Sequence, residues 1–456
     1  MAKVMVLSSC ANIIPPEGGP KDTLPPVLIK AEPGDSTLNF NSGKITLTFN
    51  EYVLLDNNWS QNVIVSPNPE NMPSIQGKLQ TVTVKLKDSL KPNTTYAVNF
   101  GNSIKDVNEG NVYKQFTYVF STGPSLSSGK INGNVQVAET GEIDSTFIVA
   151  LHNNLEDSAV KKIRPLYYTT LDGKGNFSFN WLPSGKYNVF VLPNDYTKKY
   201  DDSTKPFAFL NEPVTVDSTA TPEVKLYVYQ EYKKDEGRQG SGTPAAPDKN
   251  RQLDTSIHIK YITSLNDEKQ DLLQPFEITL QNKITGFDSS QIILSDTNYN
   301  PIKGYVISID TSLKQVTLSY AWKEESQFKL IVRKEAFTDS AGNHLPQDDT
   351  LSFKTAAQKE YGSMRLRFAN LDMNKNPVLQ LVQGGIIVDS IPISGEIYRK
   401  LYKPGEYELR ILYDSNKNGR WDAGNYLLKK QPEISVSIPR KLTIKANWDN
   451  EVNVNL

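Results

Sequence analysis

The chain has 456 residues, enough for two to four domains at ~100–200 residues each. Its charge is nearly balanced, with 50 Lys and Arg against 51 Asp and Glu, which argues against a nucleic-acid-binding protein. A single cysteine excludes an intramolecular disulfide and a Cys-based zinc site, and the three histidines do not form the H-x-x-x-H spacing of metal hydrolases.

The only cysteine, Cys10, ends the sequence Leu7-Ser8-Ser9-Cys10 and follows the apolar run Val4–Leu7. This resembles a bacterial lipobox, in which the signal peptide is cut before a cysteine that then carries lipid. The Pro- and Gly-containing residues that follow suit a semi-rigid tether, and we assign residues 1–23 to signal remnant and tether. The apolar run is shorter than the ~7–15 residues of a signal-peptide core, so a free thiol is the alternative.

From residue 24 onward, apolar and polar residues alternate, which is typical of half-buried strands. In residues 24–125 and 126–230 the expected strands include Ile45–Phe49, Val82–Leu86, Phe116–Phe120, Phe147–Leu151, Phe177–Phe179, Tyr187–Val191 and Val224–Val228. Residues 231–255 differ, because Lys233–Pro247 has neither periodicity nor a large apolar residue. We expect a flexible linker or an exposed loop there.

After this segment the pattern repeats. Phe276–Leu280 matches Ile45–Phe49, and Lys403–Ile411 matches the region ending at Val191. The repeat predicts a duplicated two-module unit, with the later modules at residues 256–357 and 358–456. The predicted fold is therefore all-β, with four tandem antiparallel β-sandwich modules in A-B-A-B order.

Two motifs carry a family resemblance. With Phe49-Asn-Glu-Tyr-Val53 and the turn Ile104–Asn111, modules one and three look like the bacterial Ig-like domain of surface proteins. Modules two and four resemble the carboxypeptidase-regulatory, transthyretin-like sandwich. The lipobox, the tether at Pro15–Pro26 and the Ig-like module together resemble Ig-like lipoproteins of the Bacteroidota. This resemblance implies an outer-membrane location, with Cys10 lipid-anchored on the periplasmic or cell-surface face.

The same resemblance implies O-glycosylation at Asp-Ser/Thr pairs that are followed by an apolar residue or Thr. Good turn chemistry is the alternative explanation for these pairs. The triplets begin at Asp22, Asp35, Asp88, Asp144, Asp157, Asp202, Asp217, Asp339, Asp349 and Asp389.

Residues 414–422 of the fourth module match the first nine positions of a calcium loop. In such a loop alternate residues supply oxygen ligands that converge on the ion, and Gly419 would allow the sharp turn. Position twelve is Asn425 instead of a bidentate Glu, so we expect a weak site of the ~10⁻⁴–10⁻³ M class. An Asx-rich hairpin turn is the alternative, and residues 194–202 of module two are expected to bind no metal. The candidate ligands are Asp414, Asn416, Asn418, Asp422 and the backbone carbonyl of Arg420.

The sequence lacks the nucleotide-loop and serine-nucleophile motifs, so no catalytic residue and no required cofactor are predicted. We expect a non-enzymatic structural subunit that binds integral outer-membrane proteins or other lipoproteins, as an accessory to β-barrel assembly or transport machinery. The alternative is a glycan-binding surface lipoprotein, for which two exposed aromatic side chains on one face would be the sign. The aromatic side chains that could stack on a sugar are Trp59, Trp181, Trp322, Trp421 and Trp448.

The three histidines are expected to be exposed loop or strand residues.

Overall fold

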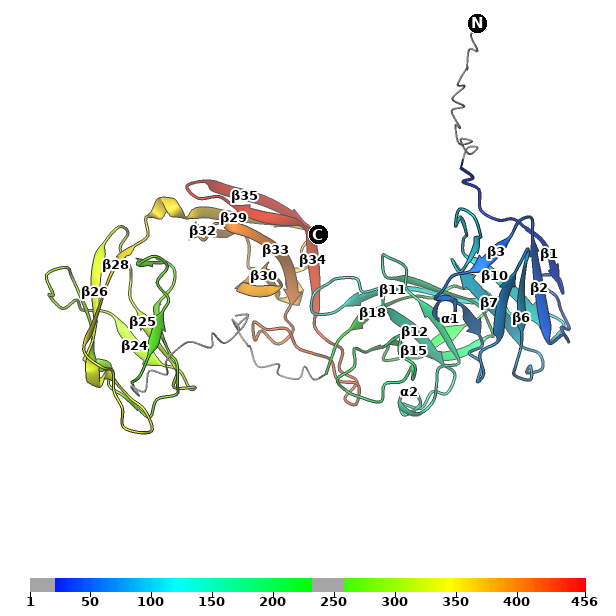
Figure 1. Ribbon diagram of the computed structural model, residues 1–456, viewed down its shortest axis with the longest axis horizontal. Coiled ribbons are helices and arrows are strands. Elements are labelled where there is room, and N and C mark those ends of the chain that lie inside the picture. Colours follow the sequence, from blue (N-terminus) through cyan, green and yellow to red (C-terminus); the bar gives the residue numbers. More distant parts are fainter. Residues whose placement is uncertain (1–20, 232–257) are drawn as a thin grey trace, which may run out of the picture. The chain divides into compact units, whose positions relative to one another are not determined.

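The computed structural model describes residues 21–231 and 258–456, so Cys10 and nearly all of the expected linker lie outside the described residues. Nearly all of the regular secondary structure in the described chain is β-strand, and its sheets are largely antiparallel, which confirms the predicted all-β class (Figure 1). Within these ranges no helix is long and apolar enough to span a membrane. The helices are α1 (Trp59–Asn62) and α2 (Ala159–Lys162), with 3-10 turns at Ser289–Gln291, Lys334–Ala336, Gln358–Glu360 and Met373–Lys375.

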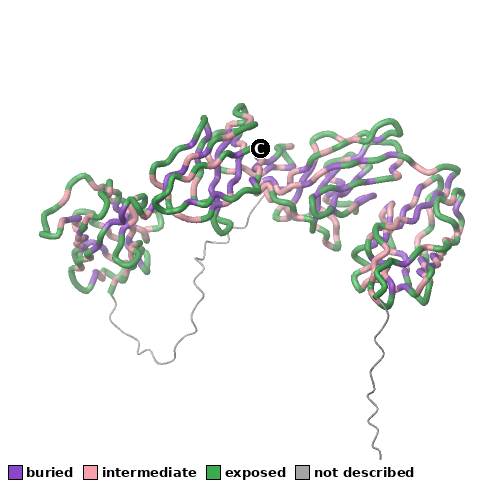
Figure 2. Tube along the Cα trace, turned by 90° about the horizontal axis from the view of Figure 1, so that it is seen from above, coloured by how far each residue is buried: buried purple, intermediate pink, exposed green. Residues whose placement is uncertain are grey.

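Contacts divide the described chain into two compact units. Unit 1 contains the described residues up to 231 together with 422–432, and unit 2 contains 258–421 and 433–456. The segment 422–432 therefore packs with residues that lie far from it in the sequence. Each unit holds two hydrophobic clusters of buried side chains, and buried and exposed positions alternate along many strands (Figure 2).

The first sandwich of unit 1 is formed by sheets of order β1-β2-β6-β5, β10-β7-β4 and β3-β8-β9. Its strands pair antiparallel, and Ile45, Leu47 and Phe49 are buried as their alternation predicts, at 0–1% exposure. The strands are β1 (Leu28–Glu32), β2 (Lys44–Phe49), β3 (Val53–Leu55), β4 (Ile64–Ser66), β5 (Ser74–Lys78), β6 (Thr81–Lys85), β7 (Thr95–Gly101), β8 (Ile104–Asp106), β9 (Val112–Tyr113) and β10 (Phe116–Ser121).

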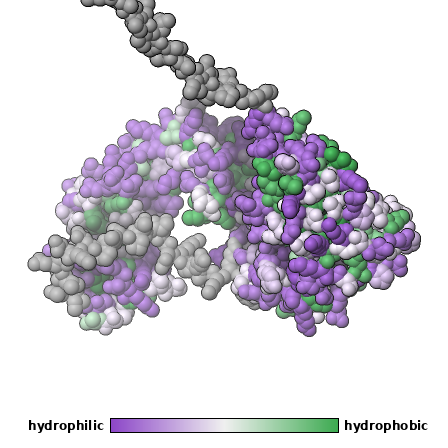
Figure 3. Space-filling view, turned by 45° about the vertical axis from the view of Figure 1, so that its right-hand side comes forward, coloured by the Kyte–Doolittle hydropathy of each residue, from purple (hydrophilic) through white to green (hydrophobic). Residues whose placement is uncertain are grey.

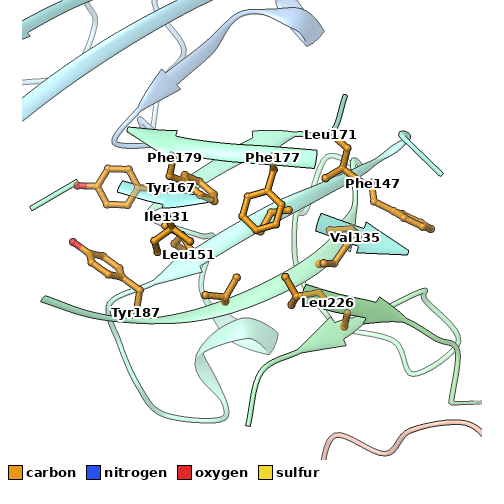
Figure 4. Packing of buried hydrophobic residues seen from close by; sticks show 14 of the residues in the cluster. Ile131, Val135, Phe147, Leu151, Tyr167, Leu171, Phe177, Phe179, Tyr187 and Leu226 are labelled. Carbon is orange, nitrogen blue, oxygen red and sulfur yellow. The ribbon is translucent and has the colours of Figure 1, made fainter. Parts of the chain in front are cut away.

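The second sandwich of unit 1 packs the sheet β14-β11-β18 against β13-β12-β15-β16, with β17 added to β15. Its first and last strands, β11 and β18, run parallel. Phe177, Phe179 and Leu151 fill the space between the layers (Figure 4). The strands are β11 (Gly129–Val137), β12 (Phe147–His152), β13 (Tyr167–Thr170), β14 (Asn176–Leu182), β15 (Gly185–Pro193), β16 (Ala208–Phe209), β17 (Val214–Val216) and β18 (Glu223–Val228).

The first sandwich of unit 2 has the same strand order as the first sandwich of unit 1. Its sheet β19-β21-β25-β24 has the same antiparallel order as β1-β2-β6-β5, and β28-β26-β23 matches β10-β7-β4. The strands are β19 (Tyr261–Thr263), β20 (Lys269–Gln270), β21 (Phe276–Leu280), β22 (Gly286–Phe287), β23 (Ile292–Ser295), β24 (Val306–Ile309), β25 (Gln315–Ser319), β26 (Gln327–Val332), β27 (Phe337–Thr338) and β28 (Asp349–Thr355).

The second sandwich of unit 2 repeats the parallel first-to-last pairing, here between β29 and β35. Its sheets are β32-β29-β35 and β31-β30-β33-β34. Each sandwich of unit 1 thus has a counterpart in unit 2, more than 200 residues later in the sequence, with the same strand order. The strands are β29 (Gly362–Ala369), β30 (Pro377–Gln383), β31 (Ile386–Pro392), β32 (Ile397–Tyr402), β33 (Gly405–Tyr413), β34 (Ile434–Ile444) and β35 (Asp449–Asn455).

A second buried layer covers the outer face of β12 and β15 in unit 1. Tyr426 of the segment 422–432 packs there with ring centroids 5.2 Å from Phe207 and 5.1 Å from Phe209. Gly424 is required at this contact, because a Cβ would lie 2.8 Å from the Tyr229 ring. His152 also belongs to this layer and is 2% exposed. The expectation that the histidines are exposed is therefore wrong for His152, because β12 is buried on both faces.

Candidate functional site

The predicted metal loop follows β33, where Asp414 is only 1% exposed. Its carboxylate accepts hydrogen bonds from the backbone N–H groups of Lys417, at 2.7 Å, and Gly419, at 2.6 Å. A third comes from the N–H of Asn418, at 3.2 Å. Lys417 and Gly419 adopt positive φ angles of 63° and 74°, which lets the backbone fold back onto the carboxylate.

The structure brings three of the predicted ligands into this one turn. The Asn416 side-chain oxygen accepts from the N–H of Asn418 at 3.0 Å, and the Asn418 oxygen accepts from the N–H of Arg420 at 2.7 Å. Asp422 is assigned with its segment to unit 1. A carboxylate has about four lone-pair sites, and backbone donors already occupy three on Asp414. The remaining site is open to a cation.

Other turns of the described chain also fold the backbone onto an aspartate, with a different hydrogen-bond pattern and without the calcium motif. Asp172, Asp296 and Asp339 each accept the backbone N–H and side-chain amide of the Asn four positions later, at 2.8–3.1 Å. These hydrogen bonds lower the pKa of all three carboxyls. Among the described residues no group of three or more His, Cys, Asp or Glu is arranged to hold a metal. The hydrogen bonds at Asp414 form a turn closed by its carboxylate, and calcium there stays a prediction.

In the corresponding loop of the second sandwich of unit 1, a lysine side chain supplies the positive charge. Asp195 accepts from the N–H of Lys198, three positions later and at φ 48°, as Asp414 accepts from the N–H of Lys417. The ammonium of Lys205 lies 2.6 Å from Asp195 and 2.7 Å from Asp201. Burial opposes ionisation of Asp195, but hydrogen bonds from Lys205, Thr197 and Lys198 outweigh it and lower its pKa to about 2. Lys205 thus supplies the positive charge that this loop needs.

A second candidate site is an apolar sheet edge in unit 2. β31 is the end strand of its sheet, and within the described residues no strand pairs with its outer side. Ile386, Ile387 and Val388 are 65%, 42% and 49% exposed. A β-bulge lies here, since Ile387 pairs with Val382 while Asp389 pairs with the preceding Leu381. The extra residue breaks the strand alternation, so three consecutive apolar side chains face solvent.

The tryptophans do not form an exposed aromatic platform in the described chain. Trp59 and Trp322 pack against hydrophobic cores, and the Trp421 indole donates to the Glu433 carbonyl at 2.7 Å. Trp448 is 65% exposed, with the Lys445 ammonium 5.5 Å from its ring. In the residues that the structure describes, no ring contact joins two exposed aromatic side chains. The hydrophobic groups visible on the face in Figure 3 are small and separated by hydrophilic ones.

The hydroxyl residues of the Asp-Ser/Thr triplets are accessible. None of the ten is buried, and two, Ser158 and Ser203, are half-buried. Every residue that the resemblance marks for O-glycosylation therefore lies at least partly at the surface. The exposed ones are Thr23, Ser36, Ser89, Ser145, Ser218, Ser340, Thr350 and Ser390.

Comparison with known proteins identifies part of the chain. Residues 22–122 match the family model of the bacterial Ig-like domain, which confirms an Ig-like domain in the first sandwich. A search of curated protein sequences gives no match.

Similar solved structures include the major pilin subunit BcpA of Bacillus cereus, at 11% identity over 72% of this chain and 99% of that chain, with a TM-score of 0.18. The BSP domain of a biofilm-associated protein aligns at 10% identity over 96% and 99%, with a TM-score of 0.18. The TIE protein of Bacillus anthracis aligns at 13% identity over 96% and 75%, with a TM-score of 0.15.

Proposed function

We propose that this chain is a non-enzymatic lipoprotein, anchored through Cys10 in the outer membrane, that acts as an interaction subunit of an integral outer-membrane protein complex. Assembly or transport machinery built on a β-barrel is the partner class. The lipobox-like sequence supports the anchor, and the Ig-like domain supports a structural role. The catalytic set that an enzyme needs is not apparent in the sequence.

The observation that carries the proposal is the apolar edge of β31. An unpaired strand edge offers backbone donors and acceptors to another chain, and natural proteins normally protect such edges with charge. Here Ile386, Ile387 and Val388 place apolar side chains at the edge instead. A partner protein that covers this edge would bury these side chains and pair with the strand backbone. A glycan ligand has less support, since exposed aromatic side chains are not paired in the described chain.

A pull-down from native membranes in mild detergent, followed by mass spectrometry, tests the partner. We expect recovery of an integral outer-membrane protein with the wild-type chain and its loss with Ile386→Lys/Val388→Lys. The matched control is Ile262→Lys/Val306→Lys, which places the same charges on exposed edge residues of the first sandwich of unit 2. If the two variants recover the partner equally well, β31 is not part of the interface.

The anchor is tested separately by cell fractionation. After a high-salt wash, which releases contacts held by charge, Cys10→Ala should move the protein from the membrane fraction to the soluble fraction, because lipid chains hold a protein on a membrane through about 0.8 kcal/mol per buried CH₂ group whatever the salt. Unchanged fractionation would disprove the lipid anchor and leave the partner protein as the means of retention.

A further inference from the structure

Three loops of unit 1 meet beside α2, and we call their common surface the loop face. It comprises residues 154–165, 194–206 and 425–431. The Tyr426 hydroxyl donates to the Asp157 carbonyl at 3.1 Å, and the N–H of Tyr200 donates to the Val160 carbonyl at 3.0 Å. Figure 1 shows the end of the late segment near α2. The loops therefore form one continuous surface although they come from distant parts of the sequence.

The loop face presents large apolar side chains at its tips. Leu427 and Leu428 are 75% and 77% exposed, and Tyr196 on the neighbouring loop is 92% exposed. The leucines are held outward, because buried Tyr426 fixes one side of the tip and a backbone bridge between Asn425 and Lys430 closes it. The two leucines therefore project from a tip that is closed by a backbone bridge and packed against the sandwich through Tyr426.

The loop face is also basic, unlike the chain as a whole. Its three segments hold eight Lys and Arg against five Asp and Glu, a net charge of +3, whereas the whole chain has −1. Three of the acids have ammonium partners within the face, since Lys205 pairs with Asp195 and Asp201 and Lys429 pairs with Asp157. Lys162 and Lys430 are exposed. The uncompensated charge that surrounds the apolar tips is therefore positive.

We propose that the loop face docks on an anionic lipid surface. Leu427, Leu428 and Tyr196 would enter the boundary between headgroups and acyl chains, while the lysines contact the phosphates. Apolar tips surrounded by basic side chains are the composition of interfacial membrane-binding segments. Separate protruding tips also suit a deformable lipid layer better than a shaped protein pocket. This contact is independent of Cys10 and gives unit 1 a membrane contact of its own.

Vesicle co-sedimentation tests the docking, with the full chain carrying Cys10→Ala so that no lipid anchor contributes. Vesicles of phosphatidylglycerol and phosphatidylethanolamine should sediment the protein, and phosphatidylcholine vesicles should not. Lys162→Glu/Lys430→Glu should weaken binding by roughly 30-fold or more, since each basic residue near an anionic surface contributes about fivefold. Leu427→Ser/Leu428→Ser should weaken it by roughly tenfold or more through lost apolar burial.

The controls place equivalent changes elsewhere in the chain. Lys174→Glu/Lys225→Glu reverses two exposed charges of the same sandwich outside the loop face, and it should keep most of the binding. Circular dichroism and melting confirm that each variant is folded, and the charge and leucine variants test the proposal independently. Absent binding to the anionic vesicles, equal binding to neutral ones, or equal losses in the control variant would overturn it. Loss of a purified protein partner in the leucine variant, without vesicle binding by the parent chain, would assign the face to protein contact instead.

Discussion

Replacing His152 by leucine should remove an acid sensitivity from the second sandwich of unit 1. The His152 ring lies at the end of β12, 2% exposed, with its Nε2 atom buried and without a hydrogen-bond partner. Its nearest aromatic neighbour is Phe190, at a centroid distance of 5.7 Å and an interplanar angle of 75°. Burial disfavours the charged imidazolium and lowers the pKa of His152 to about 4.

The direction of the pH effect on stability follows from proton uptake on unfolding. A histidine in the unfolded chain titrates near pH 6.5, whereas folded His152 takes up its proton only near pH 4. Between these values the unfolded state binds more protons, so the free energy of unfolding falls as the pH falls. The shifted pKa of His152 changes the free energy of unfolding by about 3 kcal/mol in all. About 2 kcal/mol of stability is lost between pH 7 and pH 5.

The assay must report on this sandwich alone, because a chain of several domains does not unfold in one step. Hydrogen-exchange mass spectrometry along a urea titration, followed on peptides from β12 and β15, provides that readout at pH 7 and pH 5. The wild-type midpoint should drop at pH 5, whereas the His152→Leu midpoint should stay nearly constant.

His258→Ser is the matched control, because His258 is exposed and its replacement should leave the pH dependence intact. Identical pH dependence in wild type and His152→Leu would show that the buried imidazole is not the titrating group. An unchanged wild-type midpoint between pH 7 and pH 5 would refute the burial argument itself.

Three further expectations concern other parts of the chain. Tyr426→Ala should destabilise unit 1 by about 3–5 kcal/mol, seen as faster proteolysis, whereas Tyr196→Ala on an exposed ring should not. If the turn at Asp414 binds calcium, millimolar calcium should raise the melting temperature against chelator by the equivalent of about 1 kcal/mol, and Asp414→Ala/Asp422→Ala should abolish the shift; a shift that survives places the ion elsewhere. Ser218→Ala should lower the intact mass of the protein from native membranes by one glycan, and an unchanged mass would leave Asp217-Ser218 as a turn.

Local alternation predicts strands such as β2 and the face that each buries. Ile45, Leu47 and Phe49 are buried because period-two patterns record which face of a sheet meets the core. His152 was predicted wrongly, although a signal existed: it ends the run Phe147–Leu151, and an unbroken apolar strand indicates burial on both faces.

The packing of Tyr426 into unit 1 had no sequence signal. The segment 422–432 shows no strand or helix period, and its partners Phe207 and Tyr229 lie about two hundred residues earlier. Contacts of this kind depend on tertiary arrangement, which neither propensity nor pattern encodes. The loop face was missed for the same reason, since its three loops become neighbours only in the folded chain.

The late origin of Tyr426 also sets an order of events for the newly made chain. Its N–H is bonded to Glu231 across 195 residues, so the aromatic layer on β12 and β15 cannot close until almost the whole polypeptide has emerged. Until then the aromatic cluster of Phe190, Phe207 and Phe209 lacks the cover that Tyr426 provides. Non-local closure of this kind is slow, and the exposed intermediate is prone to aggregate. Maturation of unit 1 therefore waits for the C-terminal part of the chain, and a truncated product would retain a surface that chaperones and proteases recognise.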